Sequence, residues 1–417
     1  MPPTSLTPPT APAPATTRHA LALVDSDYAD TPYDTWAAAT GTRLTLLVSA
    51  EKYPQYAHLP EARPIDGYHE GGELERAALE SVGGGRPSAV VARAEGDVLR
   101  AARLRELLGL SGQRWESARA FRDKVLMKTI LREHGVPVPA FAPVRVAFDL
   151  FGFVAEHGYP VVVKPAYGAG SSGTHILRGQ ADLDALLAEG LPEDAEVERF
   201  VEGQMYVVDG LAVQGRPVAA FSSVYLNGGC LAFRGGDHMG VAQLTRDDPL
   251  VPRLTAYAAQ VLAALPTPEC TTFHLEVFHT PDDRLVICEV GSRTGGGLTQ
   301  AAIRACAGFD LDERWFAGQL GERVAPAEVL QGVEPGHAFG WVVFYPEKGR
   351  LAALPGEPPA FVAEQRVHGT VGRSYQGGEK SGKYLCGYVV TGRDTDEVAK
   401  HTEELAAWYA DRIRWEK

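Results

Sequence analysis

The chain has 417 residues, of which 45% are hydrophobic and 22% are charged. This balance suffices for buried cores in roughly two to four domains, and it excludes a largely disordered, collagen-like or coiled-coil protein. Asp and Glu outnumber Lys and Arg by 53 to 40, so the formal net charge is -13. That charge argues against nucleic acid or an anionic membrane as the main partner.

The five cysteines are scattered, and no C-x-x-C pair occurs. An odd number of unclustered cysteines indicates free thiols in a reducing compartment, so we expect a cytoplasmic protein. No apolar run approaches the roughly 18 residues of a membrane span. Residues 1–18 are rich in Pro, Thr and Ala and lack the basic start and apolar stretch of a signal peptide, which predicts a disordered tail.

Short apolar runs alternate with helical patterns in the first part of the chain, which predicts a parallel sheet covered by helices. The expected strands are 20–24, 44–48 and 89–92, and the expected helices are 73–82 and 97–108. Ligands of such sheets gather at the carboxyl ends of the strands. Glu95 follows the third run and is therefore a candidate substrate residue, although taken alone it fits a solvated loop carboxylate better.

The next segment, 118–134, has apolar residues at helical spacing, and Gly135, Pro137 and Pro139 end the helix. Strand patterns follow, and a turn rich in Pro and Asp joins the last two of them. We expect strands at 160–164, 174–177, 195–201, 205–213, 272–278 and 285–290, and helices at 181–188 and 394–413.

A glycine-rich segment, GAGSSG at 168–173, directly follows the expected strand PVVVKP. It satisfies G-x-G-x-x-G, but dinucleotide binding needs a helix after the loop, and 174–177 indicates a strand. A Walker A loop is excluded because no Gly-Lys-Ser/Thr closes the segment. The pattern therefore predicts either a flap whose backbone N–H groups and hydroxyls wrap a polyphosphate, or a flexible hairpin.

Two lysines and one extended segment accompany this flap. Lys164 ends an apolar strand, where an unpaired ammonium is costly, so we expect an anion beside it, and the adjacent flap predicts that this anion is a polyphosphate. Lys124, taken alone, fits a solvated surface lysine. The segment VERFVEG at 197–203 either presents backbone groups to a planar base or is simply a strand.

Two glutamates lie on strands that we expect to face each other. We expect Phe278 to pair with Leu285. Glu289 then stands opposite His274 and diagonal to Glu276, so both carboxylates share one face, roughly 6–8 Å apart. Carboxylates this close need a cation, and oxygen ligands beside a phosphate-binding loop suit Mg²⁺. We expect His274 to support the site or the core, because Mg²⁺ prefers oxygen.

Arg293 follows Glu289 and opens a loop of sequence Arg-Thr-Gly-Gly-Gly. A fixed guanidinium beside glycine amides suits a developing oxyanion or an acyl phosphate, and a salt bridge to one of the two carboxylates is the alternative. In the loop 233–240, Arg234 and His238 either contact a substrate carboxylate or belong to a flexible surface loop.

Six segments, taken in order, resemble the motifs of the ATP-grasp superfamily. They are RDK (122–124), VVVKP (161–165), GAGSSG (168–173), ERFVEG (198–203), FHLE (273–276) and EVGSR (289–293). Each motif alone is loose, but their order and spacing are specific and cover most of the chain. Within the superfamily the chain is most similar to the carboxylate–amine ligases that join amino acids, the L-amino-acid ligase and peptide ligase group.

The resemblance implies an α/β (α+β) fold of the ATP-grasp type. It would comprise an N-terminal Rossmann-like domain with a parallel sheet, a small lid domain, and a large C-terminal domain built on an antiparallel sheet. The expected divisions are a disordered tail at 1–18, the N-terminal domain at 19–118, linker helices and lid at 119–196, and the catalytic domain at 197–417.

The resemblance also implies roles for individual residues. Lys124 and Lys164 would hold the α- and β-phosphates of ATP. Arg293 would steady the acyl phosphate and would be catalytic together with Lys164. The flap over the triphosphate would include Gly168, Gly170, Ser171 and Ser172. The adenine and ribose would lie along Glu198, Arg199, Phe200, Val201 and Gln204, the last replacing a Glu of many members.

Glu276 and Glu289 would bind two Mg²⁺ ions, with Mn²⁺ as the alternative ion, and Gly291 replaces an Asn that many members have. The substrates would contact Glu95, Arg234, His238, Gly295 and Gly296. The implied reaction is ATP-dependent amide formation between two amino acids through an acyl phosphate, giving a dipeptide or a γ-glutamyl amide, with release of ADP and phosphate.

Other activities of the same scaffold stay open. An acid–thiol ligase and a nucleotide-binding protein without catalysis are the alternatives, whereas a carboxylase-type subunit needs a biotin carrier and no carrier-like segment is seen. A protein kinase is excluded because the H-R-D and D-F-G elements are absent. The partners would be small carboxylates and amines, and a homodimer is expected only because homodimers are common among similar proteins.

Overall fold

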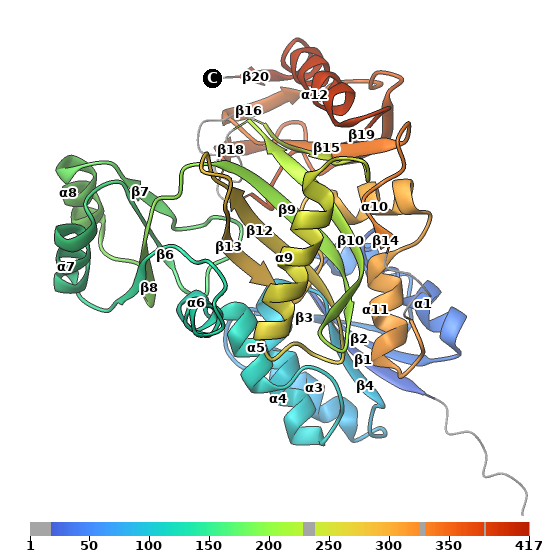
Figure 1. The fold of residues 1–417 in the computed structure, drawn as a ribbon. Helices are drawn as coiled ribbons and strands as arrows, with labels where there is room; N and C mark the ends of the chain where they lie inside the picture. Colours follow the sequence, from blue (N-terminus) through green and yellow to red (C-terminus); the bar gives the residue numbers. More distant parts are fainter. Residues whose placement is uncertain (1–17, 228–237, 325–329, 379–380, 417) are drawn as a thin grey trace, which may run out of the picture.

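The structure, a computed structural model, describes residues 18–227, 238–324, 330–378 and 381–416. The expected tail at 1–18 therefore lies outside the described residues except for Arg18. The overall architecture is a mixed α/β fold with a parallel sheet, a projecting antiparallel sheet and a large antiparallel sheet (Figure 1). Residues from all three parts line one cavity.

The N-terminal sheet is parallel, with strand order β3-β2-β1-β4. Its strands are β1 (His19–Val24), β2 (Arg43–Ser49), β3 (Ala62–Ile65) and β4 (Ala89–Ala92), and its helices are α1 (Tyr33–Thr40), α2 (Tyr53–Tyr56), α3 (Glu73–Val82) and α4 (Val98–Leu108). All of β1 is buried, because its alternate residues feed two cores. Leu21 and Leu23 pack with α3, whereas Ala22 and Val24 pack with Phe316 of the C-terminal part.

The expected single helix at 118–134 is wrong, because the structure has two helices there. They are α5 (Trp115–Arg122) and α6 (Lys124–Glu133). Asp123 between them has extended backbone angles, and its carboxylate accepts a hydrogen bond from the Leu126 N–H at 3.0 Å. Asp is a strong N-cap residue, so it starts a new helix within a continuous apolar pattern.

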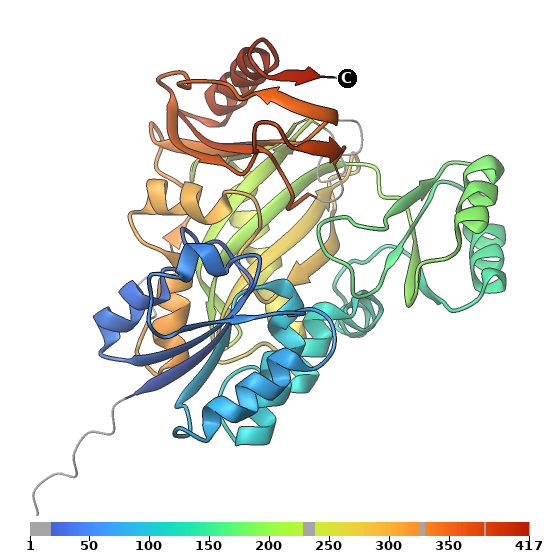
Figure 2. The same ribbon diagram turned by 180° about the vertical axis from the view of Figure 1, so that it is seen from behind.

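The segment from Phe141 to Arg199, called the lid below, forms a small antiparallel sheet that projects from the rest of the molecule (Figures 1 and 2). The strand order is β5-β8-β6-β7, and two helices cover one face. The elements are β5 (Phe141–Val144), α7 (Ala147–His157), β6 (Val161–Pro165), β7 (His175–Leu177), α8 (Gln180–Glu189) and β8 (Ala195–Arg199). The residues between β6 and β7 are the glycine-rich segment.

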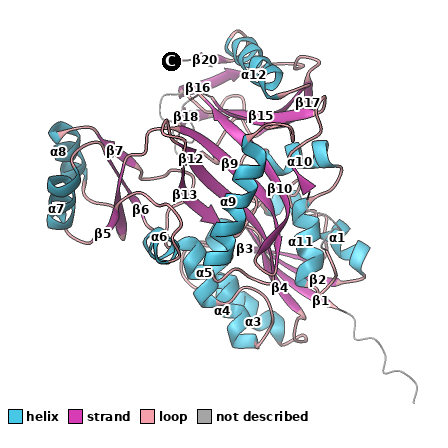
Figure 3. Ribbon diagram, in the orientation of Figure 1, coloured by secondary structure: helices cyan, strands magenta, loops and turns pink. Residues whose placement is uncertain are grey.

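The large sheet is antiparallel along the order β13-β12-β9-β10-β11-β15-β19-β17, and β14 pairs with β10 (Figure 3). Its strands are β9 (Gln204–Val213), β10 (Arg216–Leu226), β11 (Met239–Gln243), β12 (Cys270–His279), β13 (Leu285–Gly291), β14 (Leu330–Gln331), β15 (Ala338–Phe344), β17 (Val362–Val367) and β19 (Cys386–Gly392). The other C-terminal elements are α9 (Leu250–Ala264), α10 (Thr299–Ala307), α11 (Leu311–Gln319), α12 (Thr395–Ala410) and a small sheet of β16 (Lys348–Ala353), β18 (Ser374–Gln376) and β20 (Arg414–Glu416).

Side-chain alternation along β12 decides which residues reach the cavity. Phe273, Leu275 and Val277 are buried in the core under α9. Since successive residues of a strand point to opposite faces, His274 and Glu276 lie on the other face, which borders the cavity. None of the helices in the described ranges is long and apolar enough to cross a membrane.

Candidate active site

A cavity of about 1520 Å³ lies between the lid, the large sheet and the carboxyl ends of the N-terminal strands. It is lined by most of the residues that the sequence singled out. They are Glu95, Lys124, Lys164, Gly168, Gly170, Ser171, Ser172, Glu198, Arg199, Phe200, Val201, Gln204, Glu276, Glu289, Arg293 and Gly296. Residues from three separate parts of the chain therefore meet in one space.

The strand pairing brings Glu276 directly opposite Glu289. The expected register is wrong, because Leu285 pairs with His279 and not with Phe278. An irregularity after Glu276 then inserts Cys288 as an extra residue on β13. Such a bulge shifts the later residues by one position, so it returns both carboxylates to the same face.

Each of these carboxylates has its own neighbours. The Lys124 ammonium lies 3.0 Å from Glu289 Oε2 and also donates to the Gly168 carbonyl at 2.7 Å. Burial alone would raise the pKa of Glu289, but Lys124 and Lys164 outweigh it and lower that pKa to about 2. The Tyr225 hydroxyl donates to Glu276 Oε1 at 3.2 Å. Lys124 therefore already neutralises one carboxylate of the pair.

His274 lies on the same face of β12 as Glu276 and also lines the cavity. Its Nδ1 lies 2.9 Å from Asp209 Oδ1, and its Nε2 lies 3.5 Å from Glu276 Oε1. Burial would lower the pKa of His274, but the Asp209 carboxylate outweighs that effect and raises the pKa to about 10. The Gly295 N–H donates to the same Asp209 oxygen at 2.7 Å, so Gly295 faces Asp209 and does not line the cavity. Nothing in the sequence pattern marked Asp209, which lies within the apolar run of β9.

Lys164 belongs to a buried ion-pair cluster that the sequence did not reveal. Its Nζ lies 2.7 Å from Glu198 Oε1 and 3.6 Å from Glu196 Oε1. Lys128, whose side chain is fully buried, lies 2.6 Å from oxygens of both glutamates. The spacing of these residues could have indicated the cluster, because Lys128 follows Lys124 by one helical turn and Glu196 precedes Glu198 on the same face of β8. In the structure these two carboxylates are the anions beside Lys164, whereas the sequence analysis expected a polyphosphate there.

The glycine-rich segment connects β6 to β7 as a loop, and no helix follows it directly. Gly170 and Gly173 have φ angles of 62° and 67°, where glycine is favoured, and a Cβ on Gly173 would lie 3.0 Å from the Pro165 ring. The Ser381 N–H donates to the Gly170 carbonyl at 3.2 Å. A C-terminal segment, including Ser381 and Tyr384, thus closes the cavity on the side of the flap.

Glu95 is neither a solvated loop carboxylate nor isolated. One of its oxygens accepts from Arg122 Nη1 and the other from Arg293 Nε. Burial would raise the pKa of Glu95, but Arg293 and Arg122 outweigh it and lower that pKa to about 2. Arg293 is in a salt bridge, but its partner is Glu95, so the expected alternative of a bridge to Glu276 or Glu289 is wrong. Arg122 belongs to the RDK segment but was not singled out.

His238, a further substrate candidate, is not among the residues that line the cavity. The His238 ring contacts the Asn227 amide and lies 5.6 Å from the Phe344 ring between centroids. Arg234 lies outside the described residues. The cavity instead extends to Asp25, Ser26 and Asp27, which follow β1 at the carboxyl edge of the N-terminal sheet.

One segment of the chain matches a family model, and the chain is similar to several known proteins. Residues 123–211 match the family model of the carbamoyl-phosphate synthase L chain, ATP binding domain. An L-arginine-specific L-amino acid ligase of Bacillus subtilis is 27% identical over 219 residues, which cover 50% of this chain and 52% of that protein. The chain thus spans about half the length of this curated relative.

Two solved structures share the architecture over almost the whole chain. An L-amino acid ligase from Bacillus licheniformis superposes with a TM-score of 0.74 at 16% identity, covering 97% of this chain and 100% of that one. A carboxyaminoimidazole ribonucleotide synthase from Aspergillus clavatus, complexed with ATP, gives a TM-score of 0.71 at 17% identity, covering 95% and 99%. These likenesses establish the fold. Together with the ordered motifs and the domain matched over residues 123–211, they support the resemblance of this chain to the ATP-grasp carboxylate–amine ligases.

Proposed function

We propose that the protein is an ATP-dependent carboxylate–amine ligase that joins two amino acids into a dipeptide or a γ-glutamyl amide. The observation that carries this proposal is the direct pairing of Glu276 with Glu289 in a cavity that also holds Lys124, Lys164 and Arg293. Pockets for one small molecule span roughly 300–1,000 Å³. The cavity of about 1520 Å³ therefore has room for a nucleotide and further substrates.

The paired carboxylates fit Mg²⁺, because they offer hard oxygen donors from facing strands. Within the described residues, no group of three or more His, Cys, Asp or Glu side chains could hold an ion by itself. The remaining donors would be phosphate oxygens, which Mg²⁺ commonly uses. When bound, the metal ions neutralise charge on the triphosphate.

The other cavity residues would bind ATP and exclude water. Lys124 and Lys164 would face the phosphates, and residues 168–173 would close over them. The segment Glu198 to Val201 and Gln204 would line the adenine and ribose. A closed flap keeps water away from the activated acid, whose hydrolysis would consume ATP without forming product.

The reaction would proceed in two displacements. A carboxylate oxygen of the first amino acid attacks the γ-phosphorus, the bond from that phosphorus to the bridging oxygen breaks, and ADP leaves. The amine nitrogen of the second amino acid then attacks the acyl carbon and gives up a proton, and the acyl–oxygen bond to phosphate breaks. Arg293 would stabilise negative charge on the acyl phosphate and on the tetrahedral intermediate.

Release of ADP tests the proposal. The protein is incubated with ATP, Mg²⁺ and pools of amino acids, and each productive pair is identified by the mass of its product. ADP release that requires particular pairs supports the ligase. ADP release that requires an acid with a thiol indicates an acid–thiol ligase, and release with bicarbonate and an amine indicates a carboxylating enzyme. Absence of turnover with every acid contradicts the proposal and favours a non-catalytic nucleotide-binding protein.

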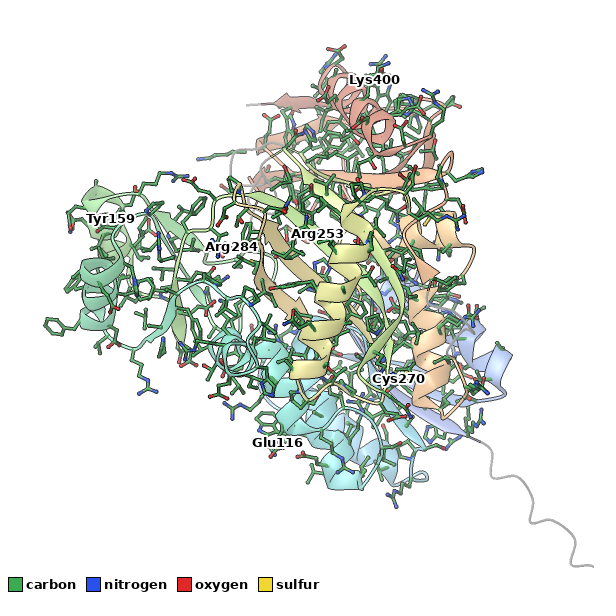
Figure 4. The ribbon with its side chains drawn as sticks, in the orientation of Figure 1. Glu116, Tyr159, Arg253, Cys270, Arg284 and Lys400 are labelled. Atoms are coloured by element: carbon green, nitrogen blue, oxygen red, sulfur yellow. The ribbon has the colours of Figure 1, made fainter. Side chains whose placement is uncertain are left out.

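Glu289→Ala should abolish this turnover, while its circular dichroism spectrum and melting curve should still be those of a folded protein. Glu116→Gln serves as the matched control, because Glu116 is exposed at the start of α5 (Figure 4). Full activity of Glu289→Ala would contradict the role given to this carboxylate.

A further inference from the structure

Each oxygen of the Glu95 carboxylate accepts a hydrogen bond from a guanidinium group. Arg122 Nη1 donates to one carboxylate oxygen and Arg293 Nε donates to the other. Its side chain is only 16% exposed, and those of Arg122 and Arg293 are 10% and 17% exposed. Charge-assisted hydrogen bonds of this kind are roughly twice as strong as neutral ones, so the two arginines hold the Glu95 carboxylate firmly.

The chain leaves space for this pairing at Gly291, two residues before Arg293. A Cβ on Gly291 would lie 3.3 Å from Glu95 Oε2, so any side chain there would crowd the carboxylate against Arg293. The glycine is therefore part of the same arrangement, since its missing side chain lets the Glu95 carboxylate approach β13.

Arg122 connects the pair to the start of the flap. Its Nη2 donates to the Tyr167 carbonyl, one residue before Gly168. The two residues after Arg122 contact the same stretch of chain. The Tyr167 hydroxyl donates to Asp123 Oδ2 at 2.8 Å, and the Lys124 N–H donates to the Ala166 carbonyl at 3.1 Å. Arg122 thus connects Glu95 to Tyr167, the residue directly before the flap.

We propose that Glu95 is a positioning residue, not a substrate ligand: it holds Arg293 in its working orientation and, through Arg122, couples Arg293 to the base of the flap. This inference rests on the proposed function for the role of Arg293. The two arginines and one carboxylate sum to a single positive charge beside Glu289. Glu95 thus fixes the direction of the Arg293 guanidinium without cancelling the attraction of the site for an anion.

Kinetics of Glu95→Gln distinguish positioning from substrate binding. Glutamine keeps the shape of the side chain and removes its charge, which weakens both hydrogen bonds to arginine. We expect kcat to fall about tenfold to a hundredfold, from the usual contribution of a hydrogen bond to a charged group, with the KM values of both amino acids changed less than about threefold. A raised KM for one amino acid with an unchanged kcat would overturn the proposal, because that pattern marks a substrate ligand.

A double-mutant cycle gives a readout that a merely structural role would not produce. If Glu95 acts through Arg293, Glu95→Gln should have little further effect in an Arg293→Lys background. Gly291→Ala should lower kcat in the same direction as Glu95→Gln, whereas Gly152→Ala should not, because a Cβ on Gly152 meets nothing within 4 Å. Additive effects of the Glu95 and Arg293 substitutions would overturn the proposal.

Hydrogen exchange measures the coupling to the flap without turnover. In Glu95→Gln, backbone amides at 166–173 should exchange faster than in the wild type, while Glu116→Gln should leave them unchanged. Unchanged exchange at 166–173 in Glu95→Gln would contradict the link through Arg122. Faster exchange in Glu95→Gln, in a protein that turns over no amino acid, would support the link from Glu95 to the flap and contradict the ligase activity. Failure of this inference and failure of the proposed function are therefore distinguishable.

Discussion

Lys128→Met should be among the most destabilising single substitutions in the chain. Its ammonium lies 2.6 Å from Glu196 Oε1 and 2.6 Å from Glu198 Oε2, and the lysine side chain is fully buried. With Lys164, the cluster contains two positive and two negative charges. Methionine keeps the length of the side chain but leaves one buried carboxylate without its cation.

Removing one partner of a buried ion pair costs about 3–5 kcal/mol. For a folded unit of 150–250 residues this corresponds to a melting temperature lowered by roughly 6–20 °C. In the wild type, burial opposes ionisation of Glu198, but Lys128 and Lys164 outweigh it and lower its pKa. In the variant, the surplus buried carboxylate has a raised pKa, so native stability is greater at low pH and is lost as the pH rises through that value.

Thermal unfolding at pH 5 and pH 8 measures both effects. The deficit of Lys128→Met relative to the wild type should be smaller at pH 5 than at pH 8. Lys400→Met is the matched control, because Lys400 lies on the surface of α12 with an exposed partner, Glu404, and should change the melting temperature little (Figure 4). A variant at position 128 as stable as the wild type at pH 8 would refute the assignment of Lys128 to this cluster.

Two further substitutions address the flap and the pH dependence of stability. Gly170→Val should impair flap closure, because residue 170 has a φ of 62° and a Cβ there would lie 3.0 Å from the Ser381 hydroxyl. The variant should form less amide per ADP released, which product mass and coupled ADP detection measure. Burial raises the pKa of Asp97 to about 6, so the contribution of Asp97 to stability should be fully present below about pH 4 and fall by about 3 kcal/mol as the pH rises through 6. Asp97→Asn should flatten this slope in denaturant titrations, and an unchanged slope would contradict the assignment to Asp97.

Part of the fold could be predicted from local patterns. The strand at 89–92 and the helix at 73–82 match β4 and α3 residue for residue, because apolar runs and amphipathic spacing are local properties. The break at Asp123 was missed because the apolar spacing continues across it, and only the capping side chain interrupts the helix. Strand β3, with Pro64 inside a short edge segment, gave no strand pattern.

The site shows the same division between local and long-range information. Glu276 and Glu289 could be placed on neighbouring strands. The bulge at Cys288 depends on how the two strands pair, so the sequence of either strand alone does not predict it. Charge partners are harder still, since Glu95 and Arg293 are far apart in the sequence. The roles of Lys128 and Asp209 could not be predicted from the sequence for the same reason. Each role becomes clear only when the buried partner of that residue is known.

The most direct test of the account is Mn²⁺ binding in the presence of a non-hydrolysable ATP analogue, followed by electron paramagnetic resonance. The ion serves as a probe of the paired carboxylates, and Glu116→Gln is the control. If Glu276 and Glu289 jointly hold the metal of a bound nucleotide, replacing either by Gln should weaken Mn²⁺ binding at least tenfold, by the scale of about 1.4 kcal/mol per tenfold, while the protein stays folded. Equal Mn²⁺ affinity in the wild type and in both variants would contradict the account.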